Sequence, residues 1–234
     1  MFVFGVIPAR GGSKGLPDKN IRSLGDIPMI GWSIRAAKES KTLDRTVVST
    51  EDPRITAESR KLGGDVPFAR PVELAADDSS IIDVLKHAVR WLEAAEKRQP
   101  DLIVLLQPTS PLRTAQDIDE TVRLVQDTDA DSAQTVAVDH SHPHHRFTME
   151  GGKLKPLLID PEKYSQRQDA PMVYRPTGAV FVVRYRVLMD EGKVRGKDHR
   201  GLVRDFESSV DVDSIWDFRL AEMVFQERLA GKRA

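Results

Sequence analysis

The chain has 234 residues, of which 40% are hydrophobic, enough to bury the core of one large domain over residues 1–234. Its 35 Lys and Arg against 36 Asp and Glu give a net charge of -1, which favours neither a nucleic acid nor a membrane as partner. The sequence has no cysteine, which excludes disulfides, thiolate metal sites and a cysteine nucleophile. The apolar run at residues 2–7 is too short for a signal peptide or a membrane span, so we expect a cytoplasmic protein.

Apolar patterning divides the chain into alternating strands and helices. Short runs rich in apolar and β-branched residues predict strands at residues 2–7, 46–49, 102–106, 132–138 and 179–183. Helical spacing of apolar residues predicts helices at residues 28–39, 52–62, about 80–97, 114–126 and 214–229. The alternation predicts a doubly wound α/β fold with a mostly parallel sheet, in which ligands bind at the carboxyl ends of the strands.

The alternation is interrupted between residues 139 and 175. Prolines break this segment and Gly151-Gly152 predicts a hairpin turn, so we expect a small excursion from the sheet. Four histidines lie at its start: His140, His142, His144 and His145. Because Pro143 splits them and neither a cysteine nor an H-E-x-x-H helix accompanies them, we interpret them as part of a loop and not as a metal site.

A glycine-rich, cationic loop follows the first predicted strand. It has the sequence A-R-G-G-S-K-G-L-P-D-K-N over residues 9–20. Its glycines permit positive φ and close approach of the backbone, so that successive N–H groups can line an anion site, while its cations supply charge. The spacing matches neither the P-loop nor the dinucleotide fingerprint. A phosphate-rich ligand is the expected guest, and the alternative is a flexible, solvated turn.

This loop, together with Ile7-Pro8, resembles the signature of the acylneuraminate cytidylyltransferases, or CMP-sialic acid synthetases. Three further segments agree in order: F-A-R-P at 68–71, L-Q-P-T-S-P-L-R at 106–113 and V-D-V-D at 210–213. The related KDO cytidylyltransferases usually carry a different first loop, so the version here favours the sialic-acid branch. The resemblance spans nearly the whole chain and implies a Rossmann-type, nucleotide-diphospho-sugar transferase-like fold with the excursion as a dimerisation element.

The resemblance implies a nucleotidyltransferase that joins CMP from CTP to the anomeric hydroxyl of a nine-carbon sugar acid, releasing pyrophosphate with the help of Mg²⁺. Sialic, legionaminic and pseudaminic acids all remain candidate acceptors. It further implies a monofunctional, cytoplasmic homodimer with shared active sites that serves cell-surface polysaccharide biosynthesis. The alternative is a regulatory or scaffold protein that kept the fold and the nucleotide but lost the chemistry.

By resemblance, eight residues form the nucleotide site: Ala9, Arg10, Gly11, Ser13, Lys14, Lys19, Asn20 and Arg70. Among them Arg10 and Lys19 are expected to contact phosphates and, with Asp213, to be catalytic, while Asn20 and Arg70 help to hold the cytidine. Phosphoryl transfer depends on positioning and charge neutralisation, which these groups can supply. The alternative for Arg70 is an ordinary surface arginine.

Two carboxylates precede the last predicted helix. Asp211 and Asp213 lie two residues apart in an extended segment, which projects both to one face, where they can share one Mg²⁺. The alternative makes Asp213 the N-cap of the helix, in competition with Ser214. Residues 1–22 hold four cations against one anion, whereas residues 211–222 hold four anions against one cation. If the fold joins these segments, one can hold a triphosphate and the other its metal.

By resemblance, the sugar acid is assigned to Gln107, Ser110, Arg167, Arg175 and Thr177. Gln107 and Ser110 follow the central strand and could hydrogen-bond sugar hydroxyls or an acylamino group. A planar guanidinium is the best partner for the sugar carboxylate, and Arg167, acting across a dimer interface, and Arg175 are the candidates. Thr177 stands where the family commonly has asparagine and could change contacts near the sugar. The sequence names no general base.

Overall fold

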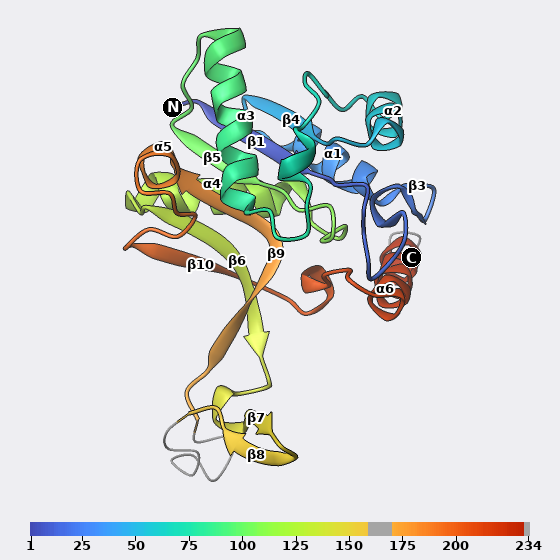
Figure 1. Ribbon diagram of the computed structural model, residues 1–234, viewed down its shortest axis with the longest axis vertical. Coiled ribbons are helices and arrows are strands. Elements are labelled where there is room, and N and C mark those ends of the chain that lie inside the picture. Colours follow the sequence, from blue (N-terminus) through green and yellow to red (C-terminus); the bar gives the residue numbers. More distant parts are fainter. Residues whose placement is uncertain (159–169, 232–234) are drawn as a thin grey trace.

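The computed structural model describes residues 1–158 and 170–231. Its central sheet (Figure 1) consists of β1 (Val3–Pro8), β4 (Arg45–Ser49), β5 (Leu102–Leu105), β6 (Ser132–Asp139), β9 (Val173–Arg184) and β10 (His199–Arg204). The spatial order is β10-β6-β9-β5-β1-β4. β1 pairs in parallel with β4 and β5, and β6 pairs in parallel with β10. The predicted α/β fold with a mostly parallel sheet is therefore confirmed.

Five α-helices of the described chain share apolar clusters with the sheet, and the sixth packs on the first loop and neighbouring segments. Their bounds are α1 (Met29–Glu39), α2 (Pro53–Lys61), α3 (Ile81–Glu96), α4 (Ala115–Thr128), α5 (Tyr185–Met189) and α6 (Ile215–Gly231). Asp52 is the N-cap of α2, and its carboxylate accepts the Arg54 N–H at 2.7 Å. For α3 the cap is Ser80, whose hydroxyl accepts the Ile82 N–H at 3.2 Å.

The sheet is buried on both faces. Alternate residues of β1 point to opposite sides, Val3 and Ile7 toward α1 and α4, and Phe4 and Val6 toward α3 and α5. A third apolar cluster joins α6 to Leu16 of the first loop and to neighbouring segments. The loop is therefore fastened to the C-terminal helix, although the two are some 200 residues apart in sequence.

β9 runs antiparallel to both of its neighbours, β5 and β6. Patterning predicted only residues 179–183, but the strand begins at Val173 and has 12 residues. Its first four residues are exposed or half-buried and carry no core pattern, which is why they were missed. There β6 and β9 pair beyond the body of the sheet, Asp139 opposite Val173, and form a two-stranded arm (Figure 1).

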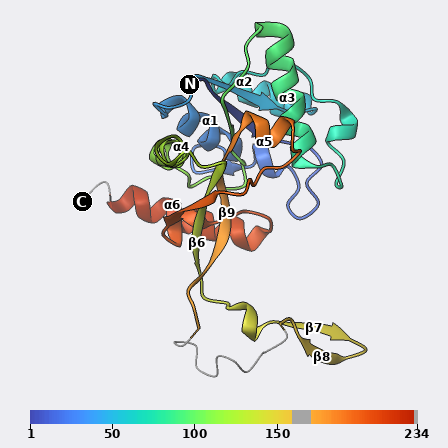
Figure 2. The same cartoon turned by 90° about the vertical axis from the view of Figure 1, so that its left-hand side faces the viewer.

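The arm ends in a hairpin of β7 (Phe147–Glu150) and β8 (Lys153–Pro156). The predicted turn is confirmed: Gly151 and Gly152 have φ of 54° and 79°, values that favour glycine. Figure 2 shows the hairpin turned away from the core at the tip of the arm. The predicted excursion therefore begins where β6 ends.

Short or polar elements escaped prediction. The edge strand β10 has only Leu202 and Val203 as large apolar residues, and β2 (Ser23–Leu24) and β3 (Ile27–Pro28) are two residues each. Elements of that length lack a period that patterning can detect. Over residues 1–158 and 170–231, no helix combines the length and hydrophobicity needed to cross a membrane.

Candidate active site

A cleft of about 270 Å³ lies at the carboxyl ends of β1, β4 and β5. Among the residues that line it, six belong to the predicted nucleotide and sugar sites: Arg10, Ser13, Lys19, Asn20, Arg70 and Gln107. They come from three of the four segments that carried the resemblance. The carboxyl ends of parallel strands are where an open α/β sheet binds ligands, so the cleft is the candidate active site.

Close packing at Gly11 and Gly15, and not unusual dihedral angles, explains these two glycines of the loop, whereas a Cβ on Gly12 would meet open space. A Cβ on Gly11 would lie 2.3 Å from Asp52 Oδ2, and one on Gly15 would lie 2.4 Å from the carbonyl oxygen of Asp213. Positive φ among the described glycines occurs elsewhere, so that part of the prediction is wrong for Gly11, Gly12 and Gly15. The tight contact at Gly15 instead brings the loop against the segment with the two predicted metal ligands.

Carboxylates from other segments hold the cations of the loop. Arg10 Nη1 pairs with Asp77 Oδ1 at 2.6 Å, and Lys14 Nζ pairs with the other oxygen of Asp77. Hydrogen bonds from these two cations keep the pKa of the Asp77 carboxyl below its ordinary value, and the bond from Lys14 contributes most. Lys19 Nζ pairs with Asp213 Oδ1 at 2.9 Å. The positive and negative segments of the sequence thus meet in one place.

Asn20 and Arg70 form buried parts of the site. Arg70 is 5% exposed, which contradicts the alternative of a surface arginine. Its guanidinium donates to Glu51, and its main-chain N–H donates to the carbonyl oxygen of Thr50. Asn20 Nδ2 donates to the carbonyl oxygen of Arg10 at 2.9 Å, and Ala9 N–H donates to Ser49 at 2.9 Å. Their contacts to a nucleotide stay a prediction.

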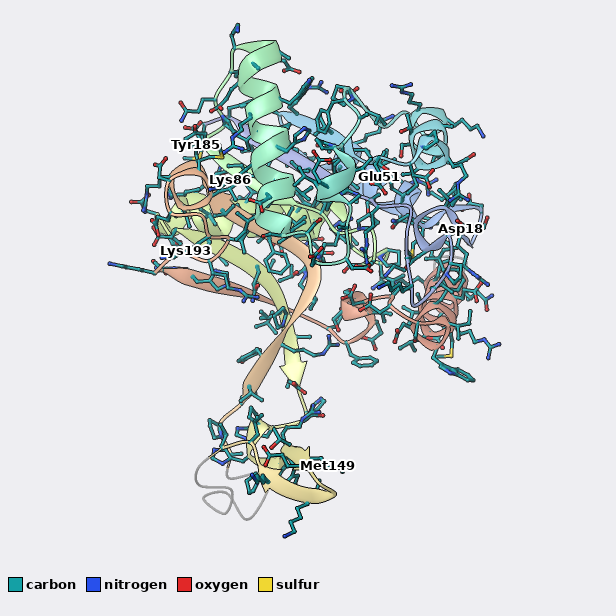
Figure 3. The ribbon with its side chains drawn as sticks, in the orientation of Figure 1. Asp18, Glu51, Lys86, Met149, Tyr185 and Lys193 are labelled. Carbon is teal, nitrogen blue, oxygen red and sulfur yellow. The ribbon has the colours of Figure 1, made fainter. Side chains whose placement is uncertain are left out.

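Sequence reasoning missed two acidic residues of the site, Glu51 and Asp77. Glu51 Oε1 accepts the N–H of Gly11 at 2.7 Å, and its other oxygen pairs with Arg70. The signal for both lay beside the recognised segments, since Glu51 follows the second predicted strand and Asp77 follows F-A-R-P within ten residues. Figure 3 labels Glu51 in the body of the protein, far from Met149 at the tip of the arm.

Asp211 and Asp213 differ in environment. The Asp213 side chain is 77% exposed, whereas Asp211 is half-buried and its buried Oδ1 has no hydrogen-bond partner among the described residues. Burial raises the pKa of Asp211, and the nearby Asp213 carboxylate raises it further. Because Ser214 caps α6, with Asp217 accepting its N–H at 2.8 Å, the alternative of Asp213 as N-cap is wrong.

The two carboxylates fit a divalent cation. Asp211 Oδ1 is buried without a hydrogen-bond partner among the described residues, and the exposed carboxylate of Asp213 follows two residues later. Carboxylate oxygens are hard ligands, which Mg²⁺ prefers. Within residues 1–158 and 170–231, no cluster of three or more His, Asp or Glu side chains is arranged to hold a metal. Mg²⁺ commonly takes one or two carboxylates and completes its shell with water and substrate phosphates, so a pair is sufficient.

The predicted sugar residues surround Gly178, which the sequence did not single out. Its φ is 76°, and a Cβ there would lie 2.8 Å from Gln107 Oε1 and 3.4 Å from Asp211 Oδ2. Ser110 Oγ is buried and donates to the Thr177 carbonyl at 3.0 Å. Thr177 Oγ1 is buried against Thr135 Oγ1 at 2.7 Å. In this structure Ser110 and Thr177 therefore support the backbone at Gly178 and do not present hydroxyls to a sugar.

The remaining predicted residues lie at the base of the arm or beyond the described chain. Arg175 is half-buried and donates to Ser209 Oγ at 2.9 Å, close to the segment of Asp211. Arg167 lies outside the described residues. His142 is buried, and its ring stacks on His144 with centroids 5.1 Å apart.

The sequence matches the cytidylyltransferase family over residues 4–229. The chain belongs to this family. A relative from Campylobacter coli, post-translational flagellin modification protein B, is 31% identical over 95% of this chain and 94% of its own. The N-acylneuraminate cytidylyltransferase of Escherichia coli O18:K1:H7 is 31% identical over 97% of this chain, which spans only 52% of that longer protein.

Two further comparisons agree. The CMP-N,N'-diacetyllegionaminic acid synthase of Legionella pneumophila is 29% identical over 97% of both chains. The solved CMP:2-keto-3-deoxy-manno-octonic acid synthetase complexed with CTP has a TM-score of 0.70 at 17% identity, covering 97% of this chain and 100% of that one. At that identity the likeness shows the fold alone. The resemblance inferred from four motifs is confirmed, and the cytidylyltransferase is a nucleotidyltransferase.

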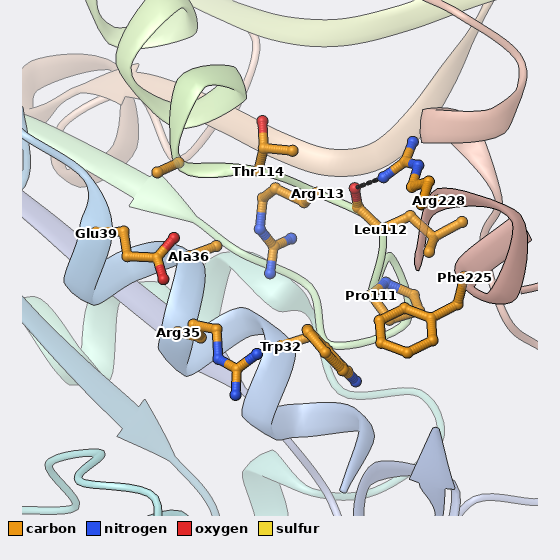
Figure 4. Close-up of a pocket in the computed structure, with 11 residues that line it drawn as sticks. Trp32, Arg35, Ala36, Glu39, Pro111, Leu112, Arg113, Thr114, Phe225 and Arg228 are labelled. Carbon is orange, nitrogen blue, oxygen red and sulfur yellow. Dashed lines mark hydrogen bonds between the residues drawn. The ribbon is translucent and has the colours of Figure 1, made fainter. Parts of the chain in front are cut away.

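A second cavity of the cytidylyltransferase, of about 310 Å³, lies between α1, α6 and residues 111–115 (Figure 4). Trp32 and Phe225 line it with ring centroids 4.5 Å apart, and Arg228 donates to the Leu112 carbonyl at 2.9 Å. It is slightly larger than the cleft but contains none of the predicted site residues. The cleft, which combines loop cations with carboxylates, is the better candidate for phosphoryl transfer.

Proposed function

We propose that this cytidylyltransferase joins CMP from CTP to the anomeric hydroxyl of a nine-carbon sugar acid and releases pyrophosphate. The observation that carries the proposal is the ion pair between Lys19, which lines the cleft, and Asp213, because it joins the cationic loop to the carboxylate segment. The names of the E. coli and Legionella relatives support the acceptor class. They leave sialic, legionaminic and pseudaminic acids open.

The cations of the loop act on the triphosphate. In the described structure Arg10 and Lys19 are paired with Asp77 and Asp213, so their charge is held in place before a ligand arrives. Phosphate oxygens would replace or share these partners. The anomeric hydroxyl loses its proton to the solvent and its oxygen forms a bond to the α-phosphorus, while the bond to the bridging oxygen of pyrophosphate breaks. The cations stabilise the charge that develops.

Asp211 and Asp213 would hold Mg²⁺. When bound, the ion supplies positive charge to the phosphates and orients them. The chain's own contribution is a pair of carboxylates on one extended segment, one of them with a buried oxygen that has no other described partner. Because Ser214 and Asp217 cap α6, the Asp213 carboxylate is not used as the helix cap.

We further propose that the enzyme is a cytoplasmic homodimer whose arm completes the acceptor site of a second copy. The hairpin at its tip exposes large apolar side chains, with Phe147 53%, Met149 69% and Leu154 60% exposed. Apolar groups gathered on a projecting element mark an interaction surface. Within the part of the chain that the structure describes, Arg175 at the base of the arm is the candidate to bind the sugar carboxylate. The product would serve cell-surface polysaccharide biosynthesis.

The test is release of pyrophosphate from CTP and Mg²⁺ with a panel of acceptors. We expect at least one of sialic, legionaminic and pseudaminic acid to support release, and the eight-carbon acid KDO to support it poorly. Release with KDO alone would contradict the proposed acceptor class. If CTP raises the melting temperature but no acid supports release, the protein is the nucleotide-binding module of the alternative.

A further inference from the structure

Glu51 lies in the connection between β4 and α2, beside the cleft. Both oxygens of its carboxylate are in use. Oε1 accepts the backbone N–H of Gly11 at 2.7 Å, while Oε2 accepts Nη2 and Nε of Arg70 at 2.5 and 3.2 Å. One carboxylate thereby joins the beginning of the phosphate loop to the arginine that lines the cleft.

This arrangement requires an acceptor at each oxygen. Gly11 N–H and the Arg70 guanidinium are both donors, so a carboxylate serves both. A glutamine has one acceptor oxygen and one NH₂ donor, so it can serve one partner only and turns an N–H toward the other. The Arg70 side chain is 4% exposed, and water has little access to replace the lost acceptor.

The contact also fixes which donors Arg70 keeps for a ligand. Nε and Nη2 are turned to Glu51, which leaves Nη1 among the donors of a side chain that lines the cleft. Main-chain bonds hold the same walls, because Arg70 N–H donates to the Thr50 carbonyl and Ala9 N–H to the Ser49 carbonyl, each at 2.9 Å. Glu51 therefore completes a frame built on the end of β4.

We infer that Glu51 is a positioning residue for the nucleotide, which holds Arg70 and the start of the loop together in the geometry that binds CTP. The inference rests on the proposed function and extends it, since it assigns the residue that links the two nucleotide-facing segments. Because this frame exists before any substrate binds, Glu51 acts on nucleotide affinity and leaves the acceptor sugar unaffected.

The test is calorimetric binding of CTP to Glu51→Gln with Mg²⁺ and without an acceptor sugar. We expect the Kd to rise about tenfold, since one hydrogen bond to a charged group is lost. Glu51→Asp keeps two acceptor oxygens and should regain part of the affinity. Glu58→Gln is the matched control, because the Glu58 carboxylate pairs with Lys61 on the surface of α2, at 2.6 Å, and its loss should leave the Kd unchanged.

A double-mutant cycle with Arg70→Ala shows whether Glu51 acts through the arginine. In that background Glu51→Gln should reduce the CTP affinity clearly less than in the wild type, because only the hydrogen bond from Gly11 N–H remains to be lost. In steady state the KM for CTP should rise, while kcat at saturating CTP and the KM for the sugar acid stay within about twofold of the wild type.

The inference would be overturned if Glu51→Gln reduced the CTP affinity equally in the wild type and in Arg70→Ala. Wild-type CTP affinity in folded Glu51→Gln would also overturn it. Thermal melts establish which variants are folded, and if Glu51→Gln is not, a folded Glu51→Ala variant with the wild-type Kd for CTP overturns it in the same way. Failure of the proposed function has a different signature, in which wild-type protein binds CTP but turns over no nine-carbon acid.

Discussion

The cleft and the arm organise their side chains in different ways. In the cleft, Lys19 and Arg70 each have a carboxylate partner from a distant segment, and Arg70 is 5% exposed. In the arm, Met149 is 69% exposed on a hairpin held by two strands. Two-stranded ribbons are marginally stable on their own in water. One chain therefore suffices to build the cleft proposed for the nucleotide, whereas the arm exposes the apolar surface proposed for a partner.

The largest effect should come from the carboxylate that faces Lys19. Asp213→Asn removes a carboxylate proposed to hold Mg²⁺ and should lower kcat roughly 100-fold or more at saturating Mg²⁺, since a charge proposed to stabilise the transition state is lost. Stopped assays of pyrophosphate release measure it. Asp190→Asn, an exposed residue after α5, is the control. Undiminished turnover of Asp213→Asn would show that the cleft does not use this carboxylate.

The next effect concerns the base of the arm. Arg175→Gln removes a guanidinium that now donates to Ser209, and it should raise the KM for the sugar acid about 30-fold with little change in the KM for CTP. Arg200→Gln, at an exposed arginine paired with Asp198, is the matched control. A rise in the KM for CTP alone would mean that Arg175 acts on the nucleotide and not on the sugar acid.

A smaller effect is expected at the tip of the arm. Met149→Lys with Leu154→Glu replaces two exposed apolar side chains and should raise the Kd of the dimer about tenfold or more, because apolar anchors carry much of the energy of an interface. Analytical ultracentrifugation measures it, and CTP binding should be unchanged. If the double variant and the wild type have the same mass distribution across concentrations, the tip is not the dimer contact.

The same difference decides how much could be predicted from the sequence. Buried strands and amphipathic helices were found because both faces of the sheet are covered, and the loop at residues 9–20 was found by its motif. The outer half of β9 and the edge strand β10 were missed because their residues are half-exposed and lack a core period. Glu51 and Asp77 lie beside recognised segments, but they were missed because their partners are 40 and 67 residues away and no local pattern shows that pairing.

The smallest expected effect is a change in the free energy of unfolding, and it concerns Asp211. Burial raises the pKa of Asp211, so the folded state binds its proton more tightly than the unfolded chain, whose ordinary value is 3.8. Above the raised pKa the ionised carboxylate therefore lowers the free energy of unfolding. Asp211→Asn should raise that free energy by about 1 kcal/mol at pH 7, as substitutions at destabilised functional positions commonly do.

Chemical denaturation of both proteins across pH checks the sign. The gain of Asp211→Asn should be present at neutral pH and disappear as the pH falls below 3.8, where Asp211 is protonated in both states. The variant should also lose the additional stabilisation that Mg²⁺ gives the wild type in the presence of CTP. A variant less stable than the wild type at pH 7 would mean that the buried oxygen of Asp211 already has a partner, and the carboxylate would then belong to the framework of the cleft and not to its metal site.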